Sequence, residues 1–153
     1  MEQLPSKLML AGFWTRMPAP HRSVSHTWLN RIVAFLVTTK PGAATRFYRD
    51  KMGFKLSSED DFALVFDANG TMLRIVKMKD GQFQPAAYTV LGWDVDDAAR
   101  AVAELVKRGI AFERYPGMPR DKDGIWTSPS GAKVAWFKDP DGNVLSLTEF
   151  ARS

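Results

Sequence analysis

Hydrophobic and polar residues between positions 31 and 80 follow two periods, one typical of strands and one typical of a helix. The apolar run that ends at Val37 predicts a buried strand over Ile32–Thr38. In Pro41–Met52 the apolar residues recur every three or four positions, which predicts an amphipathic helix that ends before Gly53. Three short strands are predicted to follow, at Phe54–Ser58, Phe62–Asp67 and Thr71–Met78, with a hairpin turn at Asn69-Gly70.

The second half of the chain repeats this order of elements. The pattern predicts a strand over Tyr88–Val95 and a helix over Asp97–Arg108, which Asp96 caps and Gly109 ends. The two copies align with a shift of 57 positions (90 minus 33). The other predicted elements are strands at Phe112–Tyr115, near Ile125–Thr127, at Lys133–Phe137 and at Val144–Phe150, with a tight turn at Asp139–Asn143.

Two repeated β-α-β-β-β units predict an α+β fold. One unit cannot cover both faces of its own sheet, so two units side by side predict a curved open sheet with helices outside. The cleft inside this sheet is the place where we expect a functional site. We expect one domain over residues 31–150, with module one at 31–80 and module two at 86–150, after a poorly ordered basic extension over residues 1–30.

Composition and charge exclude several classes of function for this chain. The chain has 153 residues and no cysteine, which excludes disulfides, thiol nucleophiles and thiolate metal sites, and which suits a reducing cytoplasm. Residues 1–31 carry four basic and one acidic residue, a balance of +3 out of the net +4. The predicted domain therefore has no excess charge to attract nucleic acid, and no apolar stretch approaches the roughly 20 residues that cross a membrane.

The positions of the two histidines limit the available chemistry further. His21 and His26 both lie in the extension, so the predicted domain contains no histidine for a Ser-His-acid arrangement. The glycines sit at predicted turns and helix ends, and no glycine-rich phosphate loop or dinucleotide fingerprint is present. The common hydrolytic and nucleotide-binding motifs are thus absent from this sequence.

Three segments resemble the vicinal-oxygen-chelate superfamily, which includes glyoxalases, bleomycin-resistance proteins and extradiol dioxygenases. They are ATRFYRDKMGF (Ala44–Phe54), WDVDDAARAVAELVKRGIAFE (Trp93–Glu113) and AWFKDPDGNVLSL (Ala135–Leu147). The resemblance covers nearly all of residues 31–150 and implies the two-module fold and a cleft for a small molecule. It also implies self-association, so we expect a homodimer. In most enzymes of this superfamily, His and Glu side chains on the first and last strands of each module hold a divalent ion that acts as a Lewis acid.

The resemblance assigns the four usual metal-ligand positions to Val33, Arg74, Val90 and Ser146. Two of these side chains are hydrocarbon, one is a permanent cation and one is a neutral hydroxyl, so none suits a divalent ion. We therefore expect no metal at these positions and no cofactor. Arg74 has two interpretations, as a clamp for an anionic or carbonyl-bearing ligand or as the partner of Asp94 in an ion pair.

Strand alternation places further candidates on the cleft face, where Asp94 is either a general base or only the partner of Arg74. Trp126 and Trp136 either stack on a flat ligand or pack in the core. The candidate ligand-binding residues are Phe35, Arg74, Asp94, Trp126, Trp136, Ser146 and Thr148, and Arg74 and Asp94 are the candidates for catalysis.

The sequence leads to one main hypothesis and two alternatives. The main hypothesis is a metal-independent protein of the glyoxalase and bleomycin-resistance type that binds a small organic molecule. The alternatives are a lyase or dioxygenase with unconventional metal ligands, and a structural or regulatory module without catalysis. Neither nucleic acid nor a membrane is an expected partner, and the sequence leaves open both the ligand and whether a reaction is catalysed.

Overall fold

The structure, a computed structural model, describes residues 28–152. Most of the predicted extension, with His21 and His26, lies outside these residues. The described residues form an α+β fold of two modules, as predicted from the sequence. Module one contains β1 (Val33–Thr38), α2 (Pro41–Thr45), η1 (Arg46–Lys51), β2 (Lys55–Glu59), β3 (Ala63–Ala68) and β4 (Thr71–Lys77).

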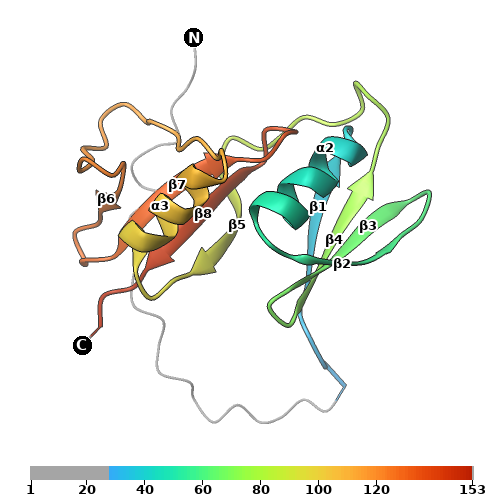
Figure 1. The fold of residues 1–153 in the computed structure, drawn as a ribbon, viewed down its shortest axis with the longest axis horizontal. Helices are drawn as coiled ribbons and strands as arrows, with labels where there is room; N and C mark the ends of the chain where they lie inside the picture. Colours follow the sequence, from blue (N-terminus) through green and yellow to red (C-terminus); the bar gives the residue numbers. More distant parts are fainter. Residues whose placement is uncertain (1–27, 153) are drawn as a thin grey trace.

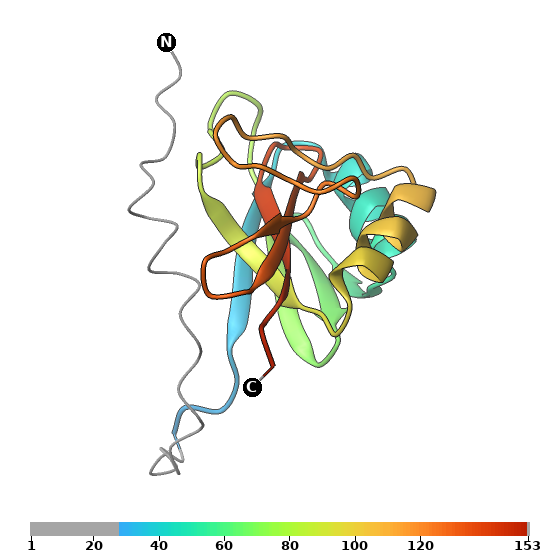
Figure 2. The same cartoon turned by 90° about the vertical axis from the view of Figure 1, so that its left-hand side faces the viewer.

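Module two has the same order of elements and the same pairing of strands. The order is β1-β4-β3-β2 in the first sheet and β5-β8-β7-β6 in the second, with one parallel pair in each. Figure 1 shows α3 over β7 and β8, and Figure 2 shows the helices gathered on one side of the strands. The elements of module two are β5 (Thr89–Asp94), α3 (Ala98–Lys107), β6 (Trp126–Thr127), β7 (Lys133–Lys138) and β8 (Val144–Glu149).

Two predicted elements and one predicted helix cap differ in the structure. The N-cap of α3 is Asp97, whose carboxylate accepts from the Arg100 N–H at 2.9 Å, and the prediction of Asp96 as the cap is wrong. The helix predicted over residues 41–52 has one α-helical turn and then a π-helix, in which the Met52 N–H donates to the Phe47 carbonyl at 2.9 Å. This wider turn buries both Phe47 and Tyr48, which are neighbours in the sequence. The strand predicted over Phe112–Tyr115 is wrong, because only Phe112 of this segment forms a bridge, to Phe137 of β7. The strand that pairs with this edge of β7 is β6.

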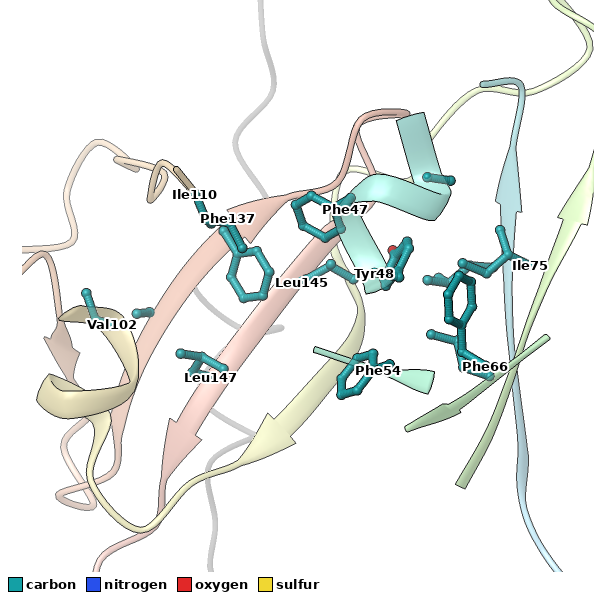
Figure 3. Close-up of a cluster of buried hydrophobic side chains, with 14 of the residues drawn as sticks. Phe47, Tyr48, Phe54, Phe66, Ile75, Val102, Ile110, Phe137, Leu145 and Leu147 are labelled. Carbon is teal, nitrogen blue, oxygen red and sulfur yellow. The ribbon is translucent and has the colours of Figure 1, made fainter. Parts of the chain in front are cut away.

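A single core joins the two modules. Phe47 lies 6.3 Å from Phe137 of module two, while Tyr48 lies 5.8 Å from Phe66 of module one, measured between ring centroids. Figure 3 shows these two side chains between Phe137 and Leu145 on one sheet and Phe66 on the other. Because the apolar residues of both sheets share this core, separating the modules would expose it to water.

The turn between β7 and β8 adds polar contacts between the two modules. Asp139 accepts hydrogen bonds from the Tyr48 hydroxyl at 2.7 Å and from the Asn143 amide at 2.8 Å. Asp141 accepts from the backbone N–H and the hydroxyl of Thr39, at 2.6 and 2.9 Å. Burial raises the pKa of Asp139, although the donors from Asn143 and Tyr48 act in the opposite direction. The turn thus fixes the end of β1 relative to β8.

The ends of the two helices meet in a reciprocal contact. The Arg108 guanidinium donates to the Lys51 carbonyl at 3.1 Å, and the Lys51 ammonium donates to the Gly109 carbonyl at 3.2 Å. Lys51 and Arg108 are separated by 57 positions, the shift that aligns the two modules. Each cation satisfies a carbonyl at the C-terminal end of the other module's helix. The internal repeat in the sequence is therefore also an approximate twofold relation in the structure.

Candidate functional site

Each sheet has one face on the shared core and one face that points away from it, which we call its open face. On the open face of the first sheet, Arg74 of β4 lies between Phe35 of β1 and Val65 of β3. Phe35 is 62% exposed and Met72, two residues from Arg74, is 48% exposed. The prediction that Phe35 and Arg74 share a face is confirmed, and the surface around the guanidinium is mainly apolar.

The Arg74 side chain is half-buried and has no partner within residues 28–152, where it makes no hydrogen bond and no ion pair. The ion pair with Asp94 that the sequence allowed is not formed. The charge of Arg74 acts on Asp60. The pKa of Asp60 is lowered mainly by the backbone N–H groups of Phe62 and Ala63 and to a smaller degree by Arg74. A cation on an apolar surface without a partner is available to an anionic or carbonyl oxygen.

The open face of the second sheet carries the other candidates. Strand pairing places Ser146 beside Gly92 and Thr148 beside Asp94. Val90 does not follow this alternation, because the register shifts between Thr89 and Leu91 and Val90 packs against the main core. The structure therefore brings together two groups of candidates on two sheets: Phe35 and Arg74 on the first, and Asp94, Trp126, Trp136, Ser146 and Thr148 on the second.

The two tryptophans belong to a small apolar cluster on this second open face. Trp136 is 3% exposed, and its indole N–H donates to the Thr89 hydroxyl at 3.1 Å. Tyr115 contacts the Trp136 ring edge-on at 5.7 Å, and Trp126 lies 5.9 Å from it. These contacts favour the packing interpretation for Trp136, whereas Trp126 is half-buried and keeps part of its ring exposed.

Two hydroxyls of this face, those of Ser146 and Thr148, lack protein partners within residues 28–152. Ser146 is 3% and Thr148 is 5% exposed, and neither hydroxyl makes a hydrogen bond to any residue that the structure describes. The Ser146 hydroxyl occupies the space beside Gly92, where an added Cβ would lie 2.5 Å from it. Asp94 is exposed, so the burial that a general base needs is missing.

Tyr115 is a residue of interest that the sequence reasoning missed. Its hydroxyl is buried and has no hydrogen-bond partner among the described residues. Burial raises the pKa of Tyr115, and the charge of Glu113 adds to this effect. The available signal was its place at the start of the long segment between α3 and β6, which is rich in proline and glycine.

The donor set of the described residues does not fit a divalent metal. The four positions that the resemblance assigned hold Val33, Arg74, Val90 and Ser146, which together offer one hydroxyl oxygen and one fixed positive charge. Within residues 28–152, no three side chains of His, Cys, Asp or Glu gather closely enough to hold an ion. The same residues include no helix long and apolar enough to cross a membrane.

Comparison with known proteins identifies the family. A family model described as the Glyoxalase/Bleomycin resistance protein/Dioxygenase superfamily matches residues 23–147. No curated protein matches the sequence. Among solved structures, the lactoylglutathione lyase from Agrobacterium tumefaciens is similar, with 19% identity, a TM-score of 0.60, and coverage of 79% of this chain and 94% of that one.

Two other solved structures are similar over their whole length. TnmS3, an antibiotic binding protein from Streptomyces sp. CB03234, is 25% identical with a TM-score of 0.61, and the match covers 86% of this chain and 100% of that one. The bleomycin resistance determinant encoded on transposon Tn5 is 21% identical with a TM-score of 0.62, covering 81% and 100%. Since the family model matches most of the sequence, this chain belongs to the Glyoxalase/Bleomycin resistance protein/Dioxygenase superfamily.

Proposed function

We propose that this protein binds a small organic molecule that carries an anionic or carbonyl oxygen, and that Arg74 makes the main polar contact in place of the usual metal. The observation that supports this proposal is the half-buried guanidinium of Arg74, which lacks a partner within residues 28–152 and lies among apolar side chains. A permanent cation in this place attracts the same oxygens that a metal ion attracts in related enzymes.

The chemistry of Arg74 favours binding over catalysis. A guanidinium has five N–H donors in a fixed plane and does not lose its proton, so it orients oxygens but transfers no proton. The apolar neighbours Phe35 and Val65 flank it on the two adjacent strands and provide a surface for a carbon skeleton. Asp94, the other catalytic candidate, is exposed and lies on the other sheet.

One of the similar structures agrees with a binding role. TnmS3 is described as an antibiotic binding protein, and it matches 86% of this chain at 25% identity. An organic molecule with an aromatic part and an oxygen acceptor suits an apolar sheet face with one cation. The proposed function is therefore capture of such a molecule.

A thermal-shift screen tests this proposal. The panel contains aromatic carboxylates and aromatic ketones, each paired with an analogue that lacks the oxygen. We expect saturable stabilisation by some of the oxygen-bearing compounds, and a loss of affinity of about ten- to hundredfold in Arg74→Gln. Arg100→Gln, which removes an equal charge from an exposed position on α3, is the matched control and should bind normally. Equal binding by both variants would exclude Arg74 as the contact.

We also propose that the chain forms a homodimer in which the partner chain packs against the margin of the open face of the first sheet, so that the Arg74 site lies enclosed between the two chains. Apolar side chains are exposed on or next to this face, including Ile32 at 81%, Phe35 at 62% and Met72 at 48%. A contiguous apolar patch of this kind on a folded protein usually marks an interaction surface. Light scattering should give twice the 17.2 kDa chain mass, and Phe35→Glu should reduce it to one chain mass. A single chain mass for the unsubstituted protein would contradict the dimer.

A further inference from the structure

A loop covers part of the open face of the second sheet. Residues 113–125, which we call the covering loop, place Tyr115 and Met118 against a small cluster that is separate from the main core. The buried members of this cluster are Val134, Trp136 and Val144. The Tyr115 ring meets the Trp136 ring edge-on, with the ring planes at 82°. The covering loop thus lies over the aromatic part of this face.

The unusual feature under this loop is a set of hydroxyls without partners. Most buried polar groups in proteins form hydrogen bonds, because leaving one unpaired costs stability. The Tyr115 hydroxyl is buried and unpaired within residues 28–152. The Ser146 and Thr148 hydroxyls also make no hydrogen bond to a described residue, although among these residues only the Tyr115 hydroxyl is a fully buried side-chain atom without a partner. Trp136 connects the set, since it contacts Tyr115 and is paired with Ser146.

The contrast with Tyr48 shows that the fold can satisfy a buried phenol. The Tyr48 hydroxyl is also buried, and it donates to Asp139 at 2.7 Å. Tyr115 has an acidic residue nearby in Glu113, but that carboxylate forms an ion pair with Lys138 at 3.7 Å and no hydrogen bond with Tyr115. The unpaired Tyr115 hydroxyl is therefore a donor for which the described part of the protein provides no acceptor.

We propose that Tyr115 is a ligand-contacting residue, which donates a hydrogen bond to an acceptor oxygen of an aromatic molecule bound on the second sheet beneath the covering loop. This inference rests on the proposed function, because it adds a second set of contacts for the same class of ligand. The half-buried Trp126 ring, which lies beside the buried Trp136 ring, provides the aromatic surface, and the hydroxyl of Ser146, which is paired with Trp136, is a further candidate contact on the sheet.

Access to Tyr115 requires the middle of the covering loop to move, because both of its ends are anchored. The Glu113 N–H donates to the Trp136 carbonyl at 2.7 Å, and Ile125 is 2% exposed in the main core, where it also bonds to Asp121. Gly117 and Gly124 have positive φ angles of 76° and 81°, which makes them suitable hinge positions.

Two variants that each remove one hydroxyl provide the test. Tyr115→Phe removes the unpaired hydroxyl, so its melting temperature should rise by about 2–6 °C. Tyr48→Phe, the matched control, removes a paired hydroxyl and should lower the melting temperature by a similar amount. A Tyr115→Phe protein that is less stable than the unsubstituted chain would show that the hydroxyl has a partner and would overturn the inference.

Binding of the best aromatic carboxylate or ketone from the panel completes the test. We expect Tyr115→Phe to weaken this binding roughly five- to tenfold, although the variant is the more stable protein. Full binding by Tyr115→Phe together with loss in Arg74→Gln overturns the role of Tyr115 and leaves the proposed function intact. A panel without any saturable binding to the unsubstituted chain, or binding that neither variant weakens, overturns both proposals.

Discussion

The close approach of β5 and β8 at Gly92 allows a quantitative test of the site's geometry. A Cβ atom added at Gly92 would lie 2.5 Å from the Ser146 hydroxyl oxygen, 3.3 Å from the Ser146 carbonyl oxygen and 3.8 Å from the Ser146 Cβ. The first distance is shorter than real Cβ atoms show to non-bonded atoms, whereas the last is an ordinary van der Waals contact. The Gly92→Ala substitution must therefore displace the Ser146 hydroxyl from its present position.

The magnitude of the effect follows from these contacts. Gly92 itself is exposed, but the new methyl group crowds the buried residue Ser146. Crowding of this kind costs about 1–3 kcal/mol, and the loss of backbone freedom in the unfolded chain returns about 0.4–1 kcal/mol, so Gly92→Ala should cost roughly 1–2 kcal/mol. Ser146→Ala removes a hydroxyl without a protein partner and should change stability by no more than about 0.5 kcal/mol. In the double variant the shortest contact is gone, so most of the loss should be recovered, with a coupling energy of about 1 kcal/mol or more.

Urea unfolding of the four proteins at pH 7, followed by circular dichroism, measures this cycle. The dependence of the free energy on urea should stay constant, because the same surface is exposed in each variant. Two results would refute the reasoning. A neutral or stabilising Gly92→Ala would place this residue away from Ser146, and an additive double variant would show that the two side chains do not meet.

Three further predictions concern the joint between the modules and the charges of the second sheet. Phe47→Ala should cost about 3–5 kcal/mol and keep one transition by both fluorescence and circular dichroism, whereas two transitions would mean that the modules unfold independently. The Ala98 N–H lowers the pKa of Glu149 below its ordinary value of 4.5, so the stability lost in Glu149→Gln at pH 7 should disappear as the pH falls through the lowered pKa; a constant loss would contradict this role. Burial raises the pKa of Asp139 above 3.8. The contribution of Asp139 to the free energy of unfolding, measured against Asp139→Asn, should therefore be complete below pH 3.8 and should be lost as the pH rises through the raised pKa. A contribution that grows as the pH rises would contradict this.

Much of the fold follows from the sequence because periodicity and turn residues are local signals. The repeat of a strand, a helix and further strands predicted both modules and their order, and strand alternation correctly placed Phe35 and Arg74 on one face of the first sheet. The replacement of metal-binding side chains could also be recognised from the sequence, because it depends only on residue type at positions that the resemblance assigns.

The parts that the sequence did not predict depend on tertiary contacts. The register shift in β5 turns Val90 toward the core, and the residue types near Val90 do not predict a bulge. The π-helical turn forms where Phe47 packs against Phe137 of module two and Tyr48 packs against Phe66 of module one. The unpaired hydroxyl of Tyr115 is visible only once the surroundings of the side chain are known. The roles assigned to Trp126, Asp94 and Thr148 stay predictions.

Titration calorimetry on chelator-treated protein tests the central claim most directly, since that claim assigns ligand recognition to Arg74 without a metal. The tightest compound from the panel is titrated into the unsubstituted chain before and after exhaustive chelation, and into Arg74→Gln. We predict the same Kd before and after chelation and a Kd about ten- to hundredfold higher for Arg74→Gln. Binding that disappears with the chelator and returns with a divalent ion would contradict this account.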